Sequence, residues 1–60
     1  MTKLYHVKGY DWEANERRRY AVTADTEDEA VRKVQEYDGA LSEVYALYLC
    51  RTPDELFLEL

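Results

Sequence analysis

The sequence has little of what small proteins often use for extra stability. Its 60 residues include a single cysteine, Cys50, so no internal disulfide can form. Cysteine and histidine spacings typical of zinc sites are absent, as are the glycine-rich loops that bind nucleotide phosphates. We therefore expect neither a metal nor a cofactor. A run of about 20 apolar residues is also missing, which argues against a membrane span.

The charge balance limits the possible partners. Acidic residues number 13 against 8 lysines and arginines, for a net charge of -5. This balance argues against binding nucleic acid through overall charge. Apolar residues make up 47% of the chain, which is enough for one small core and predicts a single domain over residues 1–60. The chain does not open on a charged and then apolar signal, so we expect a cytoplasmic protein.

The first half of the chain predicts a β-hairpin. Lys3–Tyr10 and Arg17–Ala24 are rich in tyrosine and valine and lack a helical period. The polar loop Asp11–Glu16 joins them and carries Trp12. Alternation along the two strands gives each an apolar face, formed by Tyr5 and Val7 in the first and by Tyr20, Val22 and Ala24 in the second.

The middle of the chain predicts an amphipathic helix over about Glu27–Asp38. Thr26 is placed to cap it, and Glu29 stands three residues later, which is a capping box. Gly39 fits the left-handed position that often ends a helix. Apolar residues recur at helical spacing and form one stripe, namely Ala30, Val31, Val34 and Tyr37.

The last third predicts two more strands. Val44–Cys50 is a nearly continuous apolar run whose length and composition are typical of a central strand. Thr52–Glu55 is compatible with a turn or with a helix start, and the alternation over Leu56–Leu60 favours the turn followed by a short strand. The predicted fold class is α+β: a small antiparallel sheet with one helix across a face, in the order ββαβ(β).

Two side chains with potential chemistry have simpler interpretations. His6 is the single histidine, and a sheet with one helix offers little depth for a substrate pocket, so we expect an imidazole on a strand face. Cys50 ends the apolar run without a neighbouring base, so we expect a buried small hydrophobe rather than a nucleophile. Neither residue predicts an enzyme.

A short basic run offers one route to function. On a strand, Arg17 and Arg19 share a face and Arg18 takes the other. With Lys3 and Lys8 on the neighbouring strand and tyrosines on the sheet, this pattern is compatible with a single-stranded nucleic-acid binder, provided that the acidic residues lie elsewhere. The alternative is a charged edge strand that discourages aggregation.

The acidic and aromatic residues predict a different function, which we favour. Six tyrosines and Trp12 exceed what one small core can hold with every polar atom satisfied, so some should be exposed, and such residues are enriched at interfaces. We expect a non-catalytic module that docks on a basic protein partner and contacts it through Tyr10, Trp12, Glu13, Glu16, Glu27 and Asp28. A structural homodimer joined through edge strands or through the apolar end Leu56–Leu60 is the alternative.

The strand-to-helix junction carries a resemblance to a known class of proteins. The segment Val22-Thr23-Ala24-Asp25-Thr26-Glu27-Asp28-Glu29-Ala30 resembles junctions in small phage-encoded proteins. Some anti-CRISPR inhibitors are similar in size, acidity and hairpin-plus-helix layout, over about residues 17–39. The resemblance implies a non-catalytic inhibitor of a host nucleic-acid machine and transfers no functional residue. Three consecutive arginines depart from the pattern of a pure nucleic-acid mimic.

Overall fold

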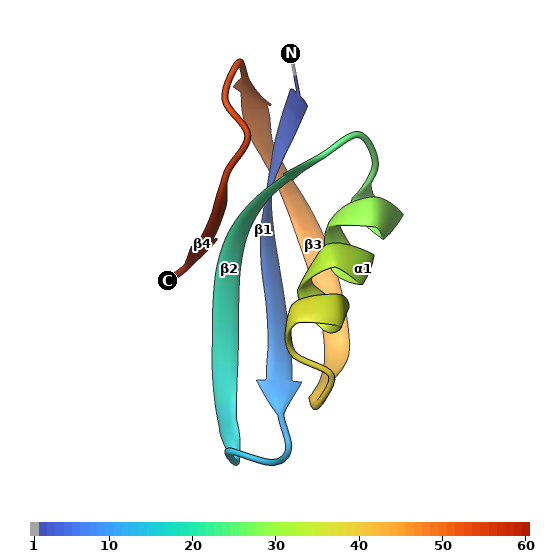
Figure 1. The fold of residues 1–60 in the computed structure, drawn as a ribbon, viewed down its shortest axis with the longest axis vertical. Coiled ribbons are helices and arrows are strands. Elements are labelled where there is room, and N and C mark those ends of the chain that lie inside the picture. The colour runs from blue at the N-terminus through green and yellow to red at the C-terminus, as the bar shows by residue number, and fades with distance from the viewer. Residues whose placement is uncertain (1) are drawn as a thin grey trace.

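A computed structural model describes residues 2–60 and confirms the predicted α+β class. The elements in chain order are strands β1 (Thr2–Asp11) and β2 (Glu16–Ala24), helix α1 (Glu27–Tyr37), and strands β3 (Leu41–Thr52) and β4 (Phe57–Glu59). Neighbouring strands are antiparallel, and the sheet order is β3-β1-β2-β4. Helix α1 packs across one face of the sheet, and the other face has no helix (Figure 1).

The β1–β2 hairpin is the regular centre of the sheet. Its register runs without a shift from the Lys3–Ala24 pair to the Asp11–Glu16 pair, so the predicted strand boundaries are correct to within one residue. Asn15 adopts a φ of 56° in the connecting turn, a left-handed conformation that asparagine tolerates better than most residues. The predicted apolar faces are also confirmed, since both point toward α1.

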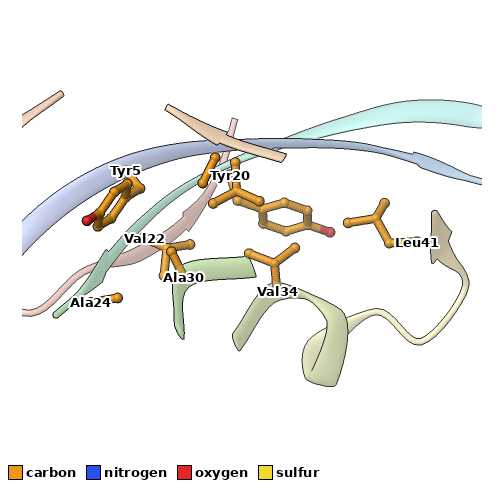
Figure 2. Packing of buried hydrophobic residues seen from close by; sticks show 9 residues of the cluster. Tyr5, Tyr20, Val22, Ala24, Ala30, Val34 and Leu41 are labelled. Carbon is orange, nitrogen blue, oxygen red and sulfur yellow. The ribbon is translucent and has the colours of Figure 1, made fainter. Parts of the chain in front are cut away.

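The core lies between that face and the helix. Tyr5 and Val7 of β1 and Tyr20 and Val22 of β2 are buried, and they pack in one cluster with side chains of α1 (Figure 2). Burying a side chain of this size contributes about 1.5–3 kcal/mol. The helix supplies two fully buried residues to the cluster, Ala30 and Val34.

The two ends of α1 are fixed by side chains. Thr26 Oγ1 accepts a hydrogen bond from the Glu29 N–H at 3.2 Å, as the capping pattern predicts. The prediction for Gly39 is wrong, because no glycine among residues 2–60 has a positive φ. Asp38 ends the helix instead: it is extended, its N–H donates to the Val34 carbonyl, and its Oδ1 accepts from the Ala40 N–H at 3.1 Å.

Strand β3 departs from the prediction. It lies at an edge of the sheet and pairs with β1, whereas the apolar run Val44–Cys50 predicts a central position. Leu47, opposite His6 on the helix-free face, is 48% exposed, and Cys50, opposite Leu4, is also exposed rather than buried. Within the run, Ala46 is buried in the core and Val44 packs against it, whereas Tyr45, Leu47, Tyr48, Leu49 and Cys50 are exposed, so burial explains only part of its apolar character.

The C-terminal segment confirms the predicted turn and fourth strand. Strand β4 is shorter than predicted and pairs with β2, with Phe57 opposite Val22. Thr23 anchors the segment: its N–H donates to the Leu56 carbonyl at 3.0 Å, and its Oγ1 accepts from the Leu56 N–H at 2.9 Å. Residues 2–60 contain one helix, α1, and it is neither long enough nor apolar enough to cross a membrane.

Candidate binding surfaces

The six predicted contact residues separate into two groups. Four of them gather where β1 turns into β2, namely Tyr10, Trp12, Glu13 and Glu16. Glu27 and Asp28 begin α1 in the other half of a molecule 34 Å long, beside the Lys3 and Tyr5 end of β1 (Figure 1). We call the first group the hairpin tip. A partner of ordinary size on the hairpin tip need not touch the helix start.

The hairpin tip holds a large exposed side chain on a fixed loop. Trp12 is 62% exposed, although its backbone N–H donates to the Ala40 carbonyl at 3.3 Å. Asp11 Oδ1 accepts hydrogen bonds from the N–H groups of Glu13 and Ala14, both at 3.0 Å. The Tyr10 hydroxyl donates to Asn15 Oδ1 across the turn. The loop is therefore ordered before any partner arrives, which lowers the entropy cost of binding.

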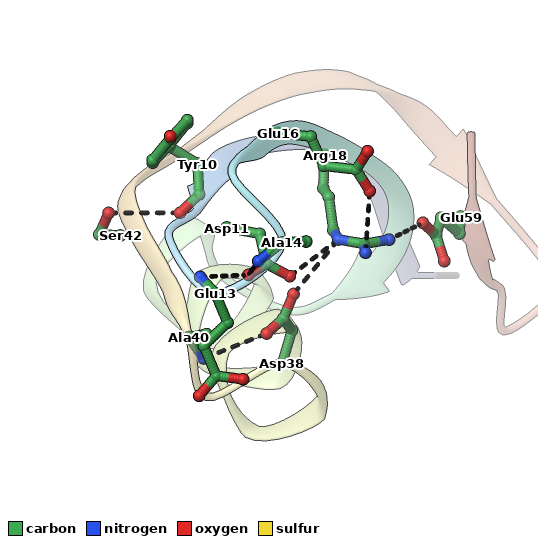
Figure 3. Close-up of polar contacts among 10 residues, drawn as sticks. All are labelled: Tyr10, Asp11, Glu13, Ala14, Glu16, Arg18, Asp38, Ala40, Ser42 and Glu59. Carbon is green, nitrogen blue, oxygen red and sulfur yellow. Dashed lines mark hydrogen bonds and ion pairs between the residues drawn. The ribbon is translucent and has the colours of Figure 1, made fainter.

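A cluster around Arg18 ties the hairpin tip to the rest of the fold. Arg18 Nε lies 2.9 Å from Asp11 Oδ2 and 3.6 Å from Asp38 Oδ2 (Figure 3). Its Nη atoms lie 3.0 Å from Glu16 Oε1 and 2.7 Å from Glu59 Oε2. Four carboxylates around one guanidinium leave a formal charge of about -3 on this side of the hairpin tip.

The electrostatics of the cluster favour ionised groups. The pKa of Asp11 is lowered, first by the hydrogen bond from the Ala14 N–H and further by the Arg18 guanidinium, although burial opposes both. The pKa of Arg18 is raised, first by its hydrogen bond to Asp11 and then by the one to Glu59. Strand alternation correctly predicts that Arg18 faces away from its two arginine neighbours. Alternation also places Glu16, in the same strand, on the side of Arg18. The other three partners cannot be predicted from the sequence, because Asp11, Asp38 and Glu59 come from β1, from the residue after α1 and from β4.

The helix-free side of the sheet carries a second surface, which we call the basic face: Lys8, Tyr10, Arg17, Arg19 and Tyr45. Strand pairing sets Lys8 opposite both Arg19 and Tyr45, and Tyr10 opposite Arg17. These residues line a recess of about 260 Å³ together with Glu43. Lys3, which the sequence suggests for the same patch, lies on the helix-covered side near Tyr5 and Glu27.

His6 lies on this same side, between Ala21 of β2 and Leu47 of β3. Its Nε2 atom is buried and makes no hydrogen bond within residues 2–60. The pKa of His6 is lowered, first by burial and then by the charges of Lys8 and Arg19. The imidazole is therefore neutral near pH 7, and the neighbouring cations make the potential at this point of the sheet positive.

The tyrosines divide as predicted between the core and the surface. Tyr5 and Tyr20 are buried, while Tyr37, Tyr45 and Tyr48 are exposed.

Comparison with known proteins finds no matching family model, no matching curated protein and no matching solved structure. The resemblance to small phage inhibitors therefore stays a prediction, and the function is inferred from the two surfaces.

Proposed function

We propose that this protein is a non-catalytic binding module that docks the hairpin tip on a basic surface of a partner protein. The observation that carries the proposal is Trp12, which is 62% exposed on a loop fixed by Asp11 and by the Ala40 carbonyl. Tryptophan is among the residues most enriched at interface hot spots, and a fixed loop loses little entropy on binding.

The sign of the partner's charge follows from the surroundings of Trp12. Glu13 is exposed next to it in the loop, and Glu16 belongs to the four carboxylates around Arg18, which leave net negative charge at the hairpin tip. A basic partner surface would complement this charge, which speeds association and selects against acidic partners. The resemblance in size, acidity and layout to phage-encoded inhibitors supports one concrete form, a cytoplasmic inhibitor of a nucleic-acid-processing host protein.

A comparative pull-down tests the proposal. Tagged protein is incubated with nuclease-treated bacterial lysate and eluted with a salt gradient, so that nucleic acid does not bridge bait and prey. A basic protein should bind the wild-type chain and elute with salt. Trp12→Ala should weaken this binding by about 30-fold, the loss of roughly 2 kcal/mol that a hot-spot residue supplies. The double reversal Glu13→Lys and Glu16→Lys should abolish it.

Matched controls separate the hairpin tip from surface chemistry in general. Tyr45→Ala removes another exposed aromatic ring, and Glu27→Lys with Asp28→Lys reverses two charges at the helix start. Both variants should retain the partner. If the Trp12 variant retains it as well, the hairpin tip is not the binding surface and the proposal fails.

Homodimer formation is a second candidate, favoured by the open edge of β3. Among the described residues this strand pairs with β1 alone, and Leu47 and Leu49 are exposed on it. An open edge of this kind invites pairing with another chain. Two register shifts divide β3, however, so that its longest regular stretch is Tyr45–Tyr48, and this ranks the candidate second. A concentration-dependent rise in sedimentation coefficient that Leu47→Lys removes would support it.

A further inference from the structure

We infer that the basic face is a binding site for single-stranded nucleic acid, a second surface that shares Tyr10 with the hairpin tip proposed above. It combines three cationic side chains, two tyrosines and a recess of about 260 Å³ on the side of the sheet without a helix. A recess of this size is smaller than a typical drug-sized pocket and suits one base or one phosphate at a time.

Strand pairing interleaves the cations with the rings. Arg17 and Arg19 share a face of β2 two residues apart, which is about 6.6–6.8 Å along a strand. Tyr10 lies opposite Arg17, and Lys8 lies opposite Arg19 with Tyr45 on its other side. Positive groups that track a sugar–phosphate backbone beside rings that stack bases are the two components of single-strand recognition.

The fold separates the charges, which removes the objection raised by the net charge of -5. Four of the acidic residues surround Arg18 on the helix-covered side, and others begin α1. Within residues 2–60, Glu43 is the carboxylate that lines the recess. The lowered pKa of His6, caused by burial and then by Lys8 and Arg19, agrees with a positive potential on this face.

The aromatic rings favour single strands over the other polyanions. An acidic polypeptide would pair with the cations but has no planar bases for Tyr10 and Tyr45. A duplex keeps its bases stacked inside, and the flat side of a sheet does not enter a groove as a helix or two-stranded ribbon does. Unpaired bases can be splayed onto aromatic side chains, and this contact tolerates any sequence because every base has a π-face.

Fluorescence anisotropy with a labelled oligothymidine of about 15 nucleotides tests the inference. Binding is measured over a series of NaCl concentrations that begins at about 20 mM. The wild-type chain should bind, with a slope of log K against log salt concentration of about -2 if three phosphates are neutralised. Arg17→Ala with Arg19→Ala should bring the slope to about -0.7. Tyr45→Leu should weaken binding roughly tenfold and leave the slope unchanged.

Two further variants sharpen the test, and circular dichroism verifies that each variant is folded. Arg32→Ala with Arg51→Ala removes the same number of charges away from the basic face and should not change affinity. Glu43→Gln should raise affinity for a polyanion, whereas it would lower affinity for a cationic ligand. The variants at the hairpin tip are not used here, so failure of this inference leaves the proposed function standing.

Three results would overturn the inference. The first is no anisotropy change at low salt. The second is equal loss of affinity in the Arg17/Arg19 and the Arg32/Arg51 double variants, which would show diffuse electrostatics rather than a site. The third is equal competition by polyglutamate or by a duplex of the same length, which would assign the face to acidic polypeptides or to double-stranded DNA.

Discussion

The two faces of this sheet share the same strands but have different neighbours. Under α1, Val7 and Val22 are completely buried, and Tyr20 is 1% exposed. On the other face the alternate residues of the same strands are His6, Lys8 and Arg19, and Leu47 stays half exposed. A chain of 60 residues has enough apolar surface to build one layer of core, so its second sheet face must be polar or partnered. The covered face holds the fold together, and the open face is available for binding.

The largest expected effect removes a ring from the covered face. Tyr20 packs edge-on against Tyr37 with ring centroids 6.0 Å apart, and against Phe57 at 5.8 Å. Tyr20→Ala should cost about 3–5 kcal/mol, as much as a core of this size supplies, and the variant should be unfolded at 25 °C by circular dichroism. Tyr45→Ala, on the open face, should change the urea midpoint little. Equal effects of the two changes would contradict the difference between the faces.

A smaller effect is expected from the two glycines, which make a matched pair. A Cβ atom at Gly9 would lie 2.6 Å from Leu41 Cγ, and Leu41 is buried, so Gly9→Ala should destabilise by about 1–3 kcal/mol through overpacking. A Cβ at Gly39 meets nothing within 4 Å, and its φ is not positive, so Gly39→Ala should stabilise by up to about 1 kcal/mol. Urea denaturation of both variants measures the difference. A destabilised Gly39 variant would show that this loop needs glycine after all.

The helix that covers the sheet depends on its first cap. Thr26→Ala removes the acceptor for the Glu29 N–H and should lower the free energy of unfolding by about 1 kcal/mol. Thr26→Ser keeps the hydroxyl and should behave nearly as the wild type in thermal denaturation. If the alanine and serine variants melt together, the hydrogen bond contributes nothing to stability.

The smallest effect concerns pH and the buried end of the covered face. The folded state lowers the pKa of Asp11, so in acid the unfolded chain binds its proton first. The stability contributed by this carboxylate is complete above about pH 4 and is lost as the pH falls through the folded pKa. Urea midpoints measured between about pH 2 and pH 6 should fall in acid for the wild type and fall less for Asp11→Asn. If the urea midpoints of the wild type and of Asp11→Asn fall equally with pH, Asp11 does not contribute to the loss of stability in acid.

The sequence predicts the local parts of this fold well. Alternation gives the faces of β1 and β2, and Thr26 with Glu29 marks the start of α1, because each signal lies within a few residues of the structure that it specifies. Sheet order is not local in this way. The apolar run of β3 has the composition of a central strand, and only the pairing of β1 with both β2 and β3 reveals that β1 takes that position.

The binding surfaces are predictable to a similar extent. Loop position alone indicates that Trp12 is exposed, and strand alternation separates Arg18 from Arg17 and Arg19. The distance between the hairpin tip and the helix start depends on the direction in which α1 runs. The separation of acidic from basic side chains depends on the side of the sheet that α1 covers. Both are properties of the assembled fold, which a one-dimensional pattern does not contain.

The central position of β1 has a consequence for how the chain acquires its structure. The strand at the middle of the sheet is the first part of this sequence, and its second neighbour, β3, lies at the far end of a long connection. The β1–β2 hairpin can form early because its loop is short, but one edge of β1 must wait for Leu41–Thr52. Long-range pairing of this kind slows folding relative to local pairing. The rate-limiting step should therefore be the docking of β3 together with α1, and refolding should be slower than in a helical bundle of equal length.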